Sequence, residues 1–291
     1  TPSENEFGIP LPLKPNIKAT LKRANLTDTY NRIIIDLSEA IRLLPDALPA
    51  EFLNRPSKPA AYALMARIYL SIRSYDKALK YADSSLNLYN TLIDYNEVST
   101  TRALPFGRLN EETLYQSTML TTTNVLKALV VPSCIADSNL YRSYDINDLR
   151  RYIFFGGTAD LPTLKGGYNG TIFLFSGLAT DELYLIKAEC LARSGAFQES
   201  MNVLNTLLEK RYKTGTFMPL TASDEEAALE LILNERRKEL PFRGLRWSDL
   251  RRLNKEGYNI TLQRKLDKNY ILPPNDRRYV LPIPHTVLNL N

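Results

Sequence analysis

The chain has 291 residues, of which 44% are hydrophobic and 24% are charged, so it is long enough to bury a sizeable core. Its net charge of +5 is a mild excess spread along the sequence, which argues against a nucleic-acid-binding protein with a concentrated basic patch. Two cysteines without metal-ligand spacing and the lone His285 argue against a zinc centre or a disulfide framework. No 18-residue apolar run and no phosphate-binding glycine motif are present, so we expect no transmembrane helix, no metal and no cofactor.

The N-terminal part of the chain is predicted to be an extended segment followed by one helix. Residues 1–19 are rich in proline, which favours an extended backbone. Thr27 or Asp28 can then cap a helix that runs to Leu44, where Pro45 ends it. Its apolar residues recur with a helical period, so one face of this helix is expected to lie against a core.

Two similar stretches predict helical hairpins. The first pairs helices at 60–71 and 75–88, and the second pairs helices at 181–194 and 197–212. Small alanines alternate with large residues in both, a pattern typical of tetratricopeptide-like helix pairs that pack closely. Two separated hairpins form no regular solenoid, so other helices must cover their open faces.

Between the hairpins, residues 91–176 show little helical period and are rich in threonine, asparagine, glycine and aromatic residues. Short strands are predicted at 111–119 and 171–175, and a short helix at 124–131. This loop-rich region is the candidate ligand region, because sugars stack their C–H faces on aromatic rings while polar side chains hold their hydroxyl groups. The candidate ligand-binding residues are Tyr141, Arg142, Tyr144, Asp145, Tyr152, Tyr168 and Asn169. The alternative is that several of these aromatic side chains pack beneath a long loop, and Phe154 and Phe155 fit that role best.

The stretch from Asn234 to Arg252 joins a basic composition to the only tryptophan of the chain. A helix capped by Thr221, Ser223 or Asp224 is predicted to end near residue 239 or 240, because Pro241 disfavours helix in the residue before it. A bend at Gly244 and a second short helix near Trp247 should follow. The stretch is either a binding surface or a structural corner. We favour the corner, in which Glu235 and Glu239 pair with Lys238 or with arginines across the bend.

This stretch also resembles the signature of the SusD/RagB family, the surface glycan-binding lipoproteins of Bacteroidetes. Its signature residues in this sequence are Glu235, Arg236, Arg237, Glu239, Gly244, Arg246, Trp247, Asp249 and Arg251. The Asp148-Leu149-Arg150-Arg151 run resembles the family's Asp-x-Arg motif, and the Pro282-Ile283-Pro284 tail resembles the family's ending. One departure is Pro241-Phe242, where the family usually has a small residue and an aromatic one.

The resemblance implies a mainly α fold, in which tetratricopeptide-like helical hairpins carry a loop-rich region with minor β structure. A single domain over residues 1–291 would then contain a first hairpin region at 20–90, the loop-rich ligand region at 91–176, and the second hairpin, signature and tail at 177–291. The usual N-terminal part of the family, with its lipid anchor, is expected to lie outside this chain. The implied function is non-catalytic capture of an oligosaccharide or polysaccharide at the outer-membrane surface, with delivery to a SusC-like TonB-dependent transporter.

Three other functions stay open at this point. A helical-repeat adaptor would bind another protein, and a SusD-like protein with a peptide cargo would use the same architecture. A glycoside hydrolase would need two carboxylates about a glycosidic bond. The acidic groups 111–112, 181–182 and 224–226 each begin a predicted helix or strand, where capping and the helix dipole explain them.

Overall fold

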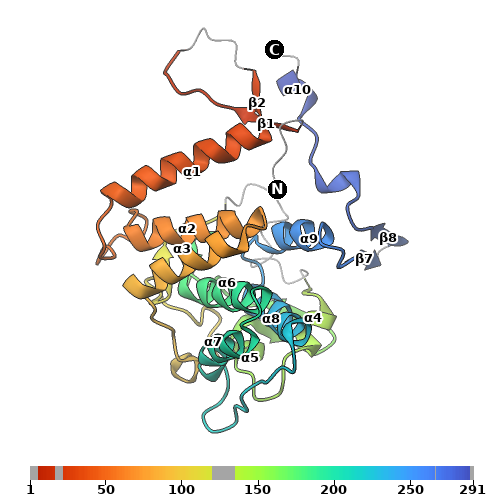
Figure 1. The fold of residues 1–291 in the computed structure, drawn as a ribbon. Coiled ribbons are helices and arrows are strands. Elements are labelled where there is room, and N and C mark those ends of the chain that lie inside the picture. The colour runs from red at the N-terminus through yellow and green to blue at the C-terminus, as the bar shows by residue number, and fades with distance from the viewer. Residues whose placement is uncertain (1–5, 17–21, 120–134, 266, 289–291) are drawn as a thin grey trace. The chain divides into compact units, whose positions relative to one another are not determined.

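The computed structural model describes residues 6–16, 22–119, 135–265 and 267–288 (Figure 1). The chain divides into two compact units. One consists of Glu39–Leu70 and Ser74–Leu245, and the other of Thr1–Ser38, Ser71–Arg73 and Arg246–Asn291. The predicted mainly helical architecture is confirmed, with short two-stranded sheets beside the helices. The single domain expected from the sequence remains a prediction.

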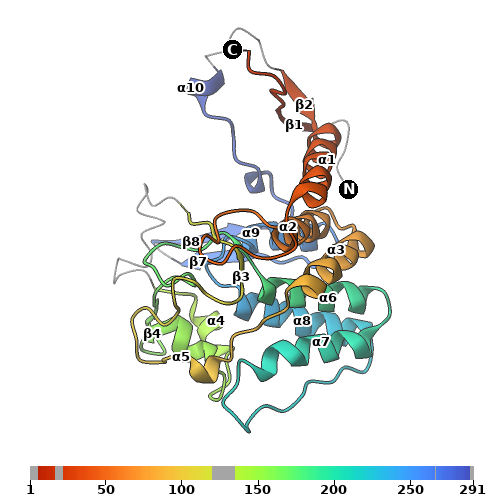
Figure 2. The same ribbon diagram turned by 90° about the vertical axis from the view of Figure 1, so that its left-hand side faces the viewer.

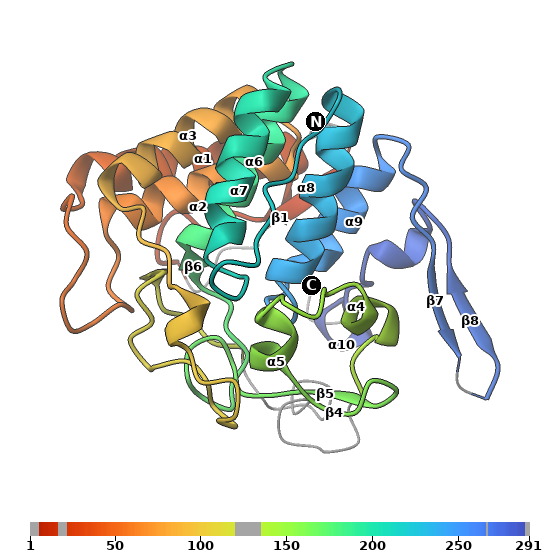
Figure 3. The same ribbon diagram turned by 90° about the horizontal axis from the view of Figure 1, so that it is seen from below.

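The two predicted hairpins are confirmed. The first consists of α2 (Lys58–Ser71) and α3 (Tyr75–Leu88), and the second of α6 (Thr180–Arg193) and α7 (Phe197–Glu209). Although the whole loop-rich region separates them in sequence, α3 packs against α6, so the hairpins lie side by side (Figure 3). The remaining face of α6 packs against α8 (Glu225–Glu239), which supplies part of the cover that the hairpins require.

Helix α6 is buried on nearly all sides because α3, α7 and α8 surround it. Small residues permit this close packing: Ala78 and Ala82 of α3, and Ala188 and Ala192 of α6, have no exposed surface. Leucines of α7 complete the apolar cluster between α6, α7 and α8. The hairpins therefore form a rigid layer of helices on which the loop-rich region can be placed.

The loop-rich region lies at one end of α6, α7 and α8 (Figures 2 and 3). Its elements are η1 (Tyr95–Glu97), β3 (Thr113–Tyr115), α4 (Ser138–Arg142), α5 (Arg150–Phe154), β4 (Phe155–Gly157) and β5 (Pro162–Leu164), and β6 (Leu178–Ala179) follows it. Strands β3 and β6 pair antiparallel, as do β4 and β5. An aromatic cluster holds the region together, and Phe154 and Phe155 are buried in it as predicted.

One prediction for this region is wrong, and another lies outside the described residues. The strand expected at 171–175 is wrong, since only an isolated bridge joins Phe175 to Thr118. The cause is a tight turn, in which the backbone N–H of Gly167 donates to the carbonyl of Thr171 over 2.7 Å and turns the chain before a strand can form. The helix expected at 124–131 lies outside the described residues.

The other compact unit contains a strand pair, β1 (Phe7–Pro10) with β2 (Arg23–Asn25), and the start of α1 (Leu26–Leu43). The α1 cap is Asn25, whose side chain accepts from the backbone N–H of Asp28 over 2.6 Å, and not Thr27 or Asp28. The predicted apolar stripe of α1 is only half-buried, and Thr29 alone in this helix is buried.

The same unit holds α9 (Arg246–Asn254), a hairpin of β7 (Leu262–Lys265) and β8 (Asn269–Leu272), η3 (Arg277–Tyr279) and α10 (His285–Leu288). The sequence did not predict the hairpin, because its strands are largely exposed and polar and show no buried alternation. Among the described residues, no helix combines the length and apolar character that a membrane crossing requires.

Candidate functional site

The signature stretch forms the corner that the sequence predicts. Helix α8 begins at the Asp224 cap, whose side chain accepts from the backbone N–H of Ala227 over 2.9 Å, and it ends at Glu239. The bend that follows contains two residues with positive φ, Phe242 at 58° and Gly244 at 75°. Helix α9 then begins at Arg246, one residue before Trp247.

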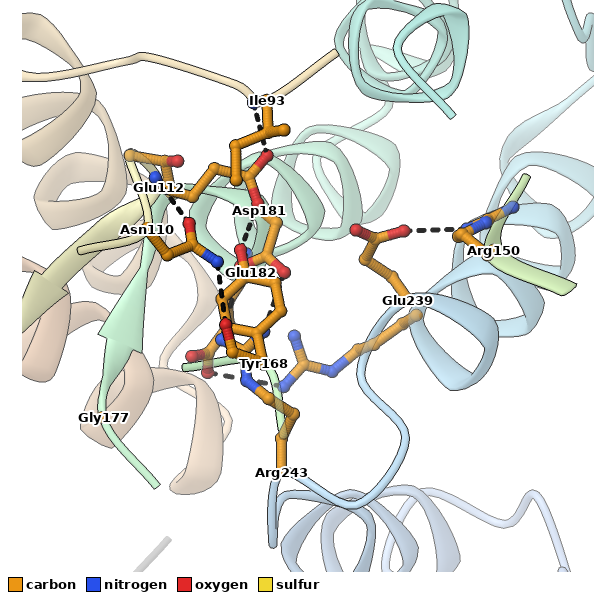
Figure 4. A network of polar contacts seen from close by, with 12 residues as sticks. Ile93, Asn110, Glu112, Arg150, Tyr168, Gly177, Asp181, Glu182, Glu239 and Arg243 are labelled. Atoms are coloured by element: carbon orange, nitrogen blue, oxygen red, sulfur yellow. Dashed lines mark hydrogen bonds and ion pairs between the residues drawn. The ribbon is translucent and has the colours of Figure 1, made fainter. Parts of the chain in front are cut away.

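A buried ion-pair network converges on the end of α8 (Figure 4). Arg150 of α5 is fully buried, and its guanidinium bonds three carboxylates. Its Nη2 lies 2.7 Å from both Asp148 Oδ2 and Glu235 Oε2, and its Nη1 lies 2.9 Å from Glu239 Oε2. The predicted Asp-x-Arg motif and the predicted signature glutamates are therefore parts of one cluster.

Arg211, just after α7, continues the network. Its Nε lies 2.7 Å from Glu239 Oε1, and its Nη2 lies 2.6 Å from Glu112 Oε1. Its guanidinium also stacks over the ring of Tyr95, 4.0 Å from the ring centroid. Glu112 in turn accepts hydrogen bonds from the backbone N–H of Ile93 and the hydroxyl of Tyr168.

Arg243, in the bend, forms the third centre. Its guanidinium donates to Asp181, with Nη1 2.8 Å from Oδ2, and lies over the rings of Tyr168 and Phe175. Next along α6, Glu182 accepts from Arg67 of the first hairpin, with Nε 2.9 Å from Oε1. The corner thus bonds to the second hairpin and to the loop-rich region, and Glu182 of the second hairpin bonds to the first.

The network explains why these charges are buried. Two charges leave water at a cost of several kcal/mol each, and their attraction repays that cost only when the geometry is good and every lone pair is engaged. Each carboxylate of Glu112, Asp181 and Glu239 is engaged by an arginine. Removing one partner from such a pair typically costs about 3–5 kcal/mol, because an uncompensated charge stays buried.

The pKa values of the buried carboxyl groups follow from the same contacts. Burial raises the pKa of Glu112 to about 7, with Arg211 opposing this shift and the neighbouring Asp181 and Glu239 adding to it. Burial likewise raises the pKa of Asp181, against the effect of Arg243. Burial alone would also raise the pKa of Glu182, but the charge and hydrogen bonds of Arg67 outweigh it and lower that pKa.

The signature residues outside this cluster serve local contacts. Arg237 reaches Asp137, the cap of α4, with Nη2 2.8 Å from Oδ2. Asp249 pairs with Arg252 within α9, and Trp247 packs on Tyr279 with ring centroids 4.7 Å apart. Arg236 lies 3.7 Å from Glu182, and Arg251 is exposed. The structural interpretation of the signature is therefore supported.

Three candidate ligand-binding residues lie inside the protein, and for them the prediction is corrected. Tyr168 is 8% exposed and donates its hydroxyl to Glu112. Tyr144 is 2% exposed and donates to the carbonyl of Lys238 over 2.7 Å, while Asn169 is fully buried. The rings of Tyr144 and Tyr168 pack in the aromatic cluster, so they offer no open face to a sugar.

The other four candidates remain at the surface of α4, α5 and the loop between them. Tyr141 and Tyr152 are half-buried, and Arg142 and Asp145 are exposed. One side of Tyr141 packs edge-on against Phe155, with ring centroids 5.7 Å apart. The Tyr152 hydroxyl donates to the carbonyl of Ile146 over 3.0 Å, which fixes the ring at the surface. We call these four residues the tyrosine surface.

Two cations beside the tyrosine surface were missed by the sequence reasoning. Arg151 lies with its guanidinium carbon 4.8 Å from the centroid of the Tyr141 ring. Lys213 lies with Nζ 5.5 Å from the centroid of the Tyr152 ring. Arg151 directly precedes the candidate residue Tyr152, so the sequence alone could have indicated it. Lys213 follows α7. Its backbone N–H donates to the carbonyl of Asn147 over 3.0 Å, and this hydrogen bond positions the residue.

One pocket opens between the loop-rich region and the corner, lined by Phe106, Phe154, Tyr168, Phe242 and Arg243 among others. Its volume of about 30 Å³ suffices for one or two water molecules and not for a sugar ring. The described residues contain no cluster of three or more histidine, cysteine, aspartate or glutamate side chains that could hold a metal ion.

Comparison with known proteins extends these observations. Residues 5–70 match the family model described as "Starch-binding associating with outer membrane", and residues 180–291 match the model of the SusD family. SusD-like protein P2 of Formosa agariphila is 25% identical, over 88% of this chain and 62% of that protein. The chain thus spans somewhat under two thirds of the length of this curated relative.

Solved structures share the fold. A SusD superfamily protein of Bacteroides thetaiotaomicron superposes with a TM-score of 0.76 at 21% identity, covering 99% of this chain and 70% of that one. A SusD-like carbohydrate binding protein of Bacteroides vulgatus gives 0.71 at 20% identity, covering 97% and 69%. The family models match two separate segments, the second of which contains the whole corner, and the fold is shared throughout. The chain belongs to the SusD/RagB family.

Proposed function

We propose that this chain is a non-catalytic glycan-binding protein. It is attached to the outer membrane by a lipid anchor, captures an oligosaccharide at the cell surface and delivers it to a SusC-like TonB-dependent transporter. The match to a starch-binding family model and the shared fold with a carbohydrate binding protein of Bacteroides vulgatus support this function.

The observation that carries the proposal is the tyrosine surface. Tyr141 and Tyr152 are held at the surface by fixed contacts, and Arg142 and Asp145 are exposed beside them. Rigid aromatic rings give a sugar an apolar platform at little cost in conformational entropy, and the neighbouring polar groups can bind its hydroxyls. Because the surface is open, it suits an extended chain that is bound weakly and then released.

The state of the carboxylates supports the absence of catalysis. Hydrolysis of a glycosidic bond needs an acid and a second carboxylate on either side of the bond. Glu112, Asp181 and Glu182 are buried and bonded to arginines, so a sugar cannot approach them. Asp224 is occupied as the cap of α8.

The test is a panel of oligosaccharides and polysaccharides, measured by calorimetry and affinity electrophoresis. We expect one class of glycan to bind, and Tyr141→Ala and Tyr152→Ala to weaken that binding. Tyr270→Ala is the control, because Tyr270 is an exposed tyrosine on β8 that does not belong to the tyrosine surface. Binding that survives both substitutions would place the ligand elsewhere.

Two further measurements separate the alternatives. Product analysis after incubation with the bound glycan should find no shortened sugars, and their release would show an enzyme. A peptide library screened in parallel should give no binders, whereas peptide binding without glycan binding would favour a peptide cargo or an adaptor. Co-purification with a co-expressed TonB-dependent receptor tests delivery.

A further inference from the structure

Each ring of the tyrosine surface holds a cation that has no carboxylate partner. Arg151 lies over Tyr141 and Lys213 lies over Tyr152, at 4.8 and 5.5 Å from the ring centroids. Throughout the part of the chain that the structure describes, no carboxylate lies within ion-pairing distance of either side chain. Neither cation is therefore held in an ion pair, although the charge of Asp145 acts on Arg151 from a longer distance.

This is not the general state of cations in the region. Arg142 pairs with Asp160 over 3.0 Å, Arg237 pairs with Asp137 over 2.8 Å, and Lys210 pairs with Asp94 over 3.1 Å. These carboxylates are engaged elsewhere, and Asp145 accepts instead from the backbone N–H of Asn147 over 2.8 Å. Carboxylates are thus present nearby, but Arg151 and Lys213 contact aromatic rings and form no ion pair with them.

A third cation, Lys165, contacts the backbone of Tyr152. The Lys165 ammonium donates to the carbonyls of Thr100 and Tyr152, at 2.5 and 2.7 Å, and it pairs with no carboxylate among the described residues. Its contacts are neutral carbonyl groups, so it adds a positive charge without an ion-pair partner beside the backbone of Tyr152. Burial lowers the pKa of Lys165, in keeping with an ammonium that no anion stabilises.

We propose that the ligand of the tyrosine surface is an anionic glycan, whose uronate carboxylates or sulfate esters bind Arg151 and Lys213. This inference rests on the proposed function and specifies its substrate class. A cation over a ring is held in place while its charge stays available, since the ring attracts it without neutralising it. A sugar can then lie against the exposed part of the tyrosine while its anionic group accepts charge-assisted hydrogen bonds from the cation.

The arrangement favours acidic sugars over neutral ones in two ways. Each charge-assisted contact is about twice as strong as a neutral hydrogen bond. Unpaired positive charge also attracts an anionic chain before contact, which raises the association rate at low ionic strength. Arg142 can assist, because its exposed pair with Asp160 is weak and easily exchanged for a ligand anion.

The experiment compares three oligosaccharides of equal length by calorimetry with the full chain: a neutral one, one that carries uronates, and one that carries sulfate esters. We expect the acidic ligands to bind at least about tenfold more tightly than the neutral one, with an affinity that falls as salt is raised. Arg151→Gln and Lys213→Gln should each weaken acidic binding by about tenfold and leave neutral binding unchanged. The comparison of uronate with sulfate identifies which anion the surface takes.

Lys77→Gln is the matched control, because Lys77 lies over Tyr69 at 5.3 Å on the first hairpin, away from the tyrosine surface. Thermal melting of each variant checks that the fold is intact. Equal binding of neutral and acidic sugars, or equal loss in the control, would overturn the inference and leave glycan binding standing. If no glycan of either kind binds, the proposed function itself fails.

Discussion

The guanidinium of Arg211 bonds the carboxylate of Glu112 with Nη2 2.6 Å from Oε1, although 99 positions separate the two residues. Both side chains are fully buried. This contact joins the segment after α7 to the residue that precedes β3 in the loop-rich region, and Glu239 extends it to the corner. The loop-rich region therefore depends on the network for its attachment.

Replacing Arg211 by methionine should destabilise the protein strongly. The change removes the partner of two buried carboxylates while keeping an apolar side chain of similar length, so we expect a loss of about 3–5 kcal/mol in the free energy of unfolding. Urea denaturation measures it. Arg142→Met is the control. Its ion pair with Asp160 is exposed, so the free energy of unfolding should change by less than about 1 kcal/mol. Similar losses in both variants would contradict the importance of the buried network.

Stability should fall as the pH rises through neutrality, because the folded protein holds a proton on Glu112 more tightly than the unfolded chain does. The pKa of this carboxyl is raised from 4.5 to about 7. The stabilisation that follows is complete below pH 4.5 and is lost as the pH passes 7, by up to about 3 kcal/mol.

Glu112→Gln cannot lose this proton, so its free energy of unfolding should depend less on pH than that of the wild type between pH 5 and 8. Urea denaturation at several pH values gives both curves. The exposed neighbour Glu111 is the control, and Glu111→Gln should keep the wild-type slope. Parallel curves for wild type and Glu112→Gln would show that Glu112 titrates normally.

Removing the hydroxyl of Tyr168 should lower stability and spare ligand binding. In Tyr168→Phe a buried hydrogen bond to Glu112 is lost, which costs about 1–3 kcal/mol. Tyr152→Phe loses only a hydrogen bond that the structure places at the surface, so a change below about 0.5 kcal/mol is expected. Chemical denaturation and a binding assay distinguish the two roles, and weaker glycan binding by a stably folded Tyr168→Phe would restore Tyr168 as a ligand residue.

Gly170 should tolerate no side chain. Its φ is +65°, and a Cβ there would lie 2.5 Å from the carbonyl oxygen of Phe106. We expect Gly170→Ala to lose more than about 2 kcal/mol, from the backbone strain together with the clash. Gly215→Ala has a similar φ of +75° and free space around the added methyl, so it should lose only about 1 kcal/mol. Equal thermal shifts in the two variants would mean that the loop gives way at Gly170.

The candidate site was predicted in part. Tyr141, Tyr144, Tyr152 and Tyr168 share the same loop-rich sequence context, yet the structure leaves two of them at the surface and buries the other two. No periodicity distinguishes them, because residues 91–176 have no regular face to predict. The burial of Tyr168 depends on Arg243 and Glu112, which pack on it from distant segments.

The corner was also predicted only in part. Its helix end, bend and charged composition were predicted, as was the pair of Glu235 with Lys238. The principal partners of Glu235 and Glu239 are instead Arg150 and Arg211, and the bend arginine Arg243 bonds Asp181. A carboxylate on a helix face predicts that a cation lies nearby, but it does not say from which segment the cation comes.

The sequence by itself determined the hairpins, the corner and the family resemblance, because helical period, small residues and proline stops act over a few neighbouring positions. Only the tertiary structure decided which aromatic rings stay open and which cations keep their charge. Arg151 and Lys213 meet the tyrosine surface from α5 and from the chain after α7. That meeting depends on how loops without a period pack on the helical layer, and such packing is a property of the whole fold.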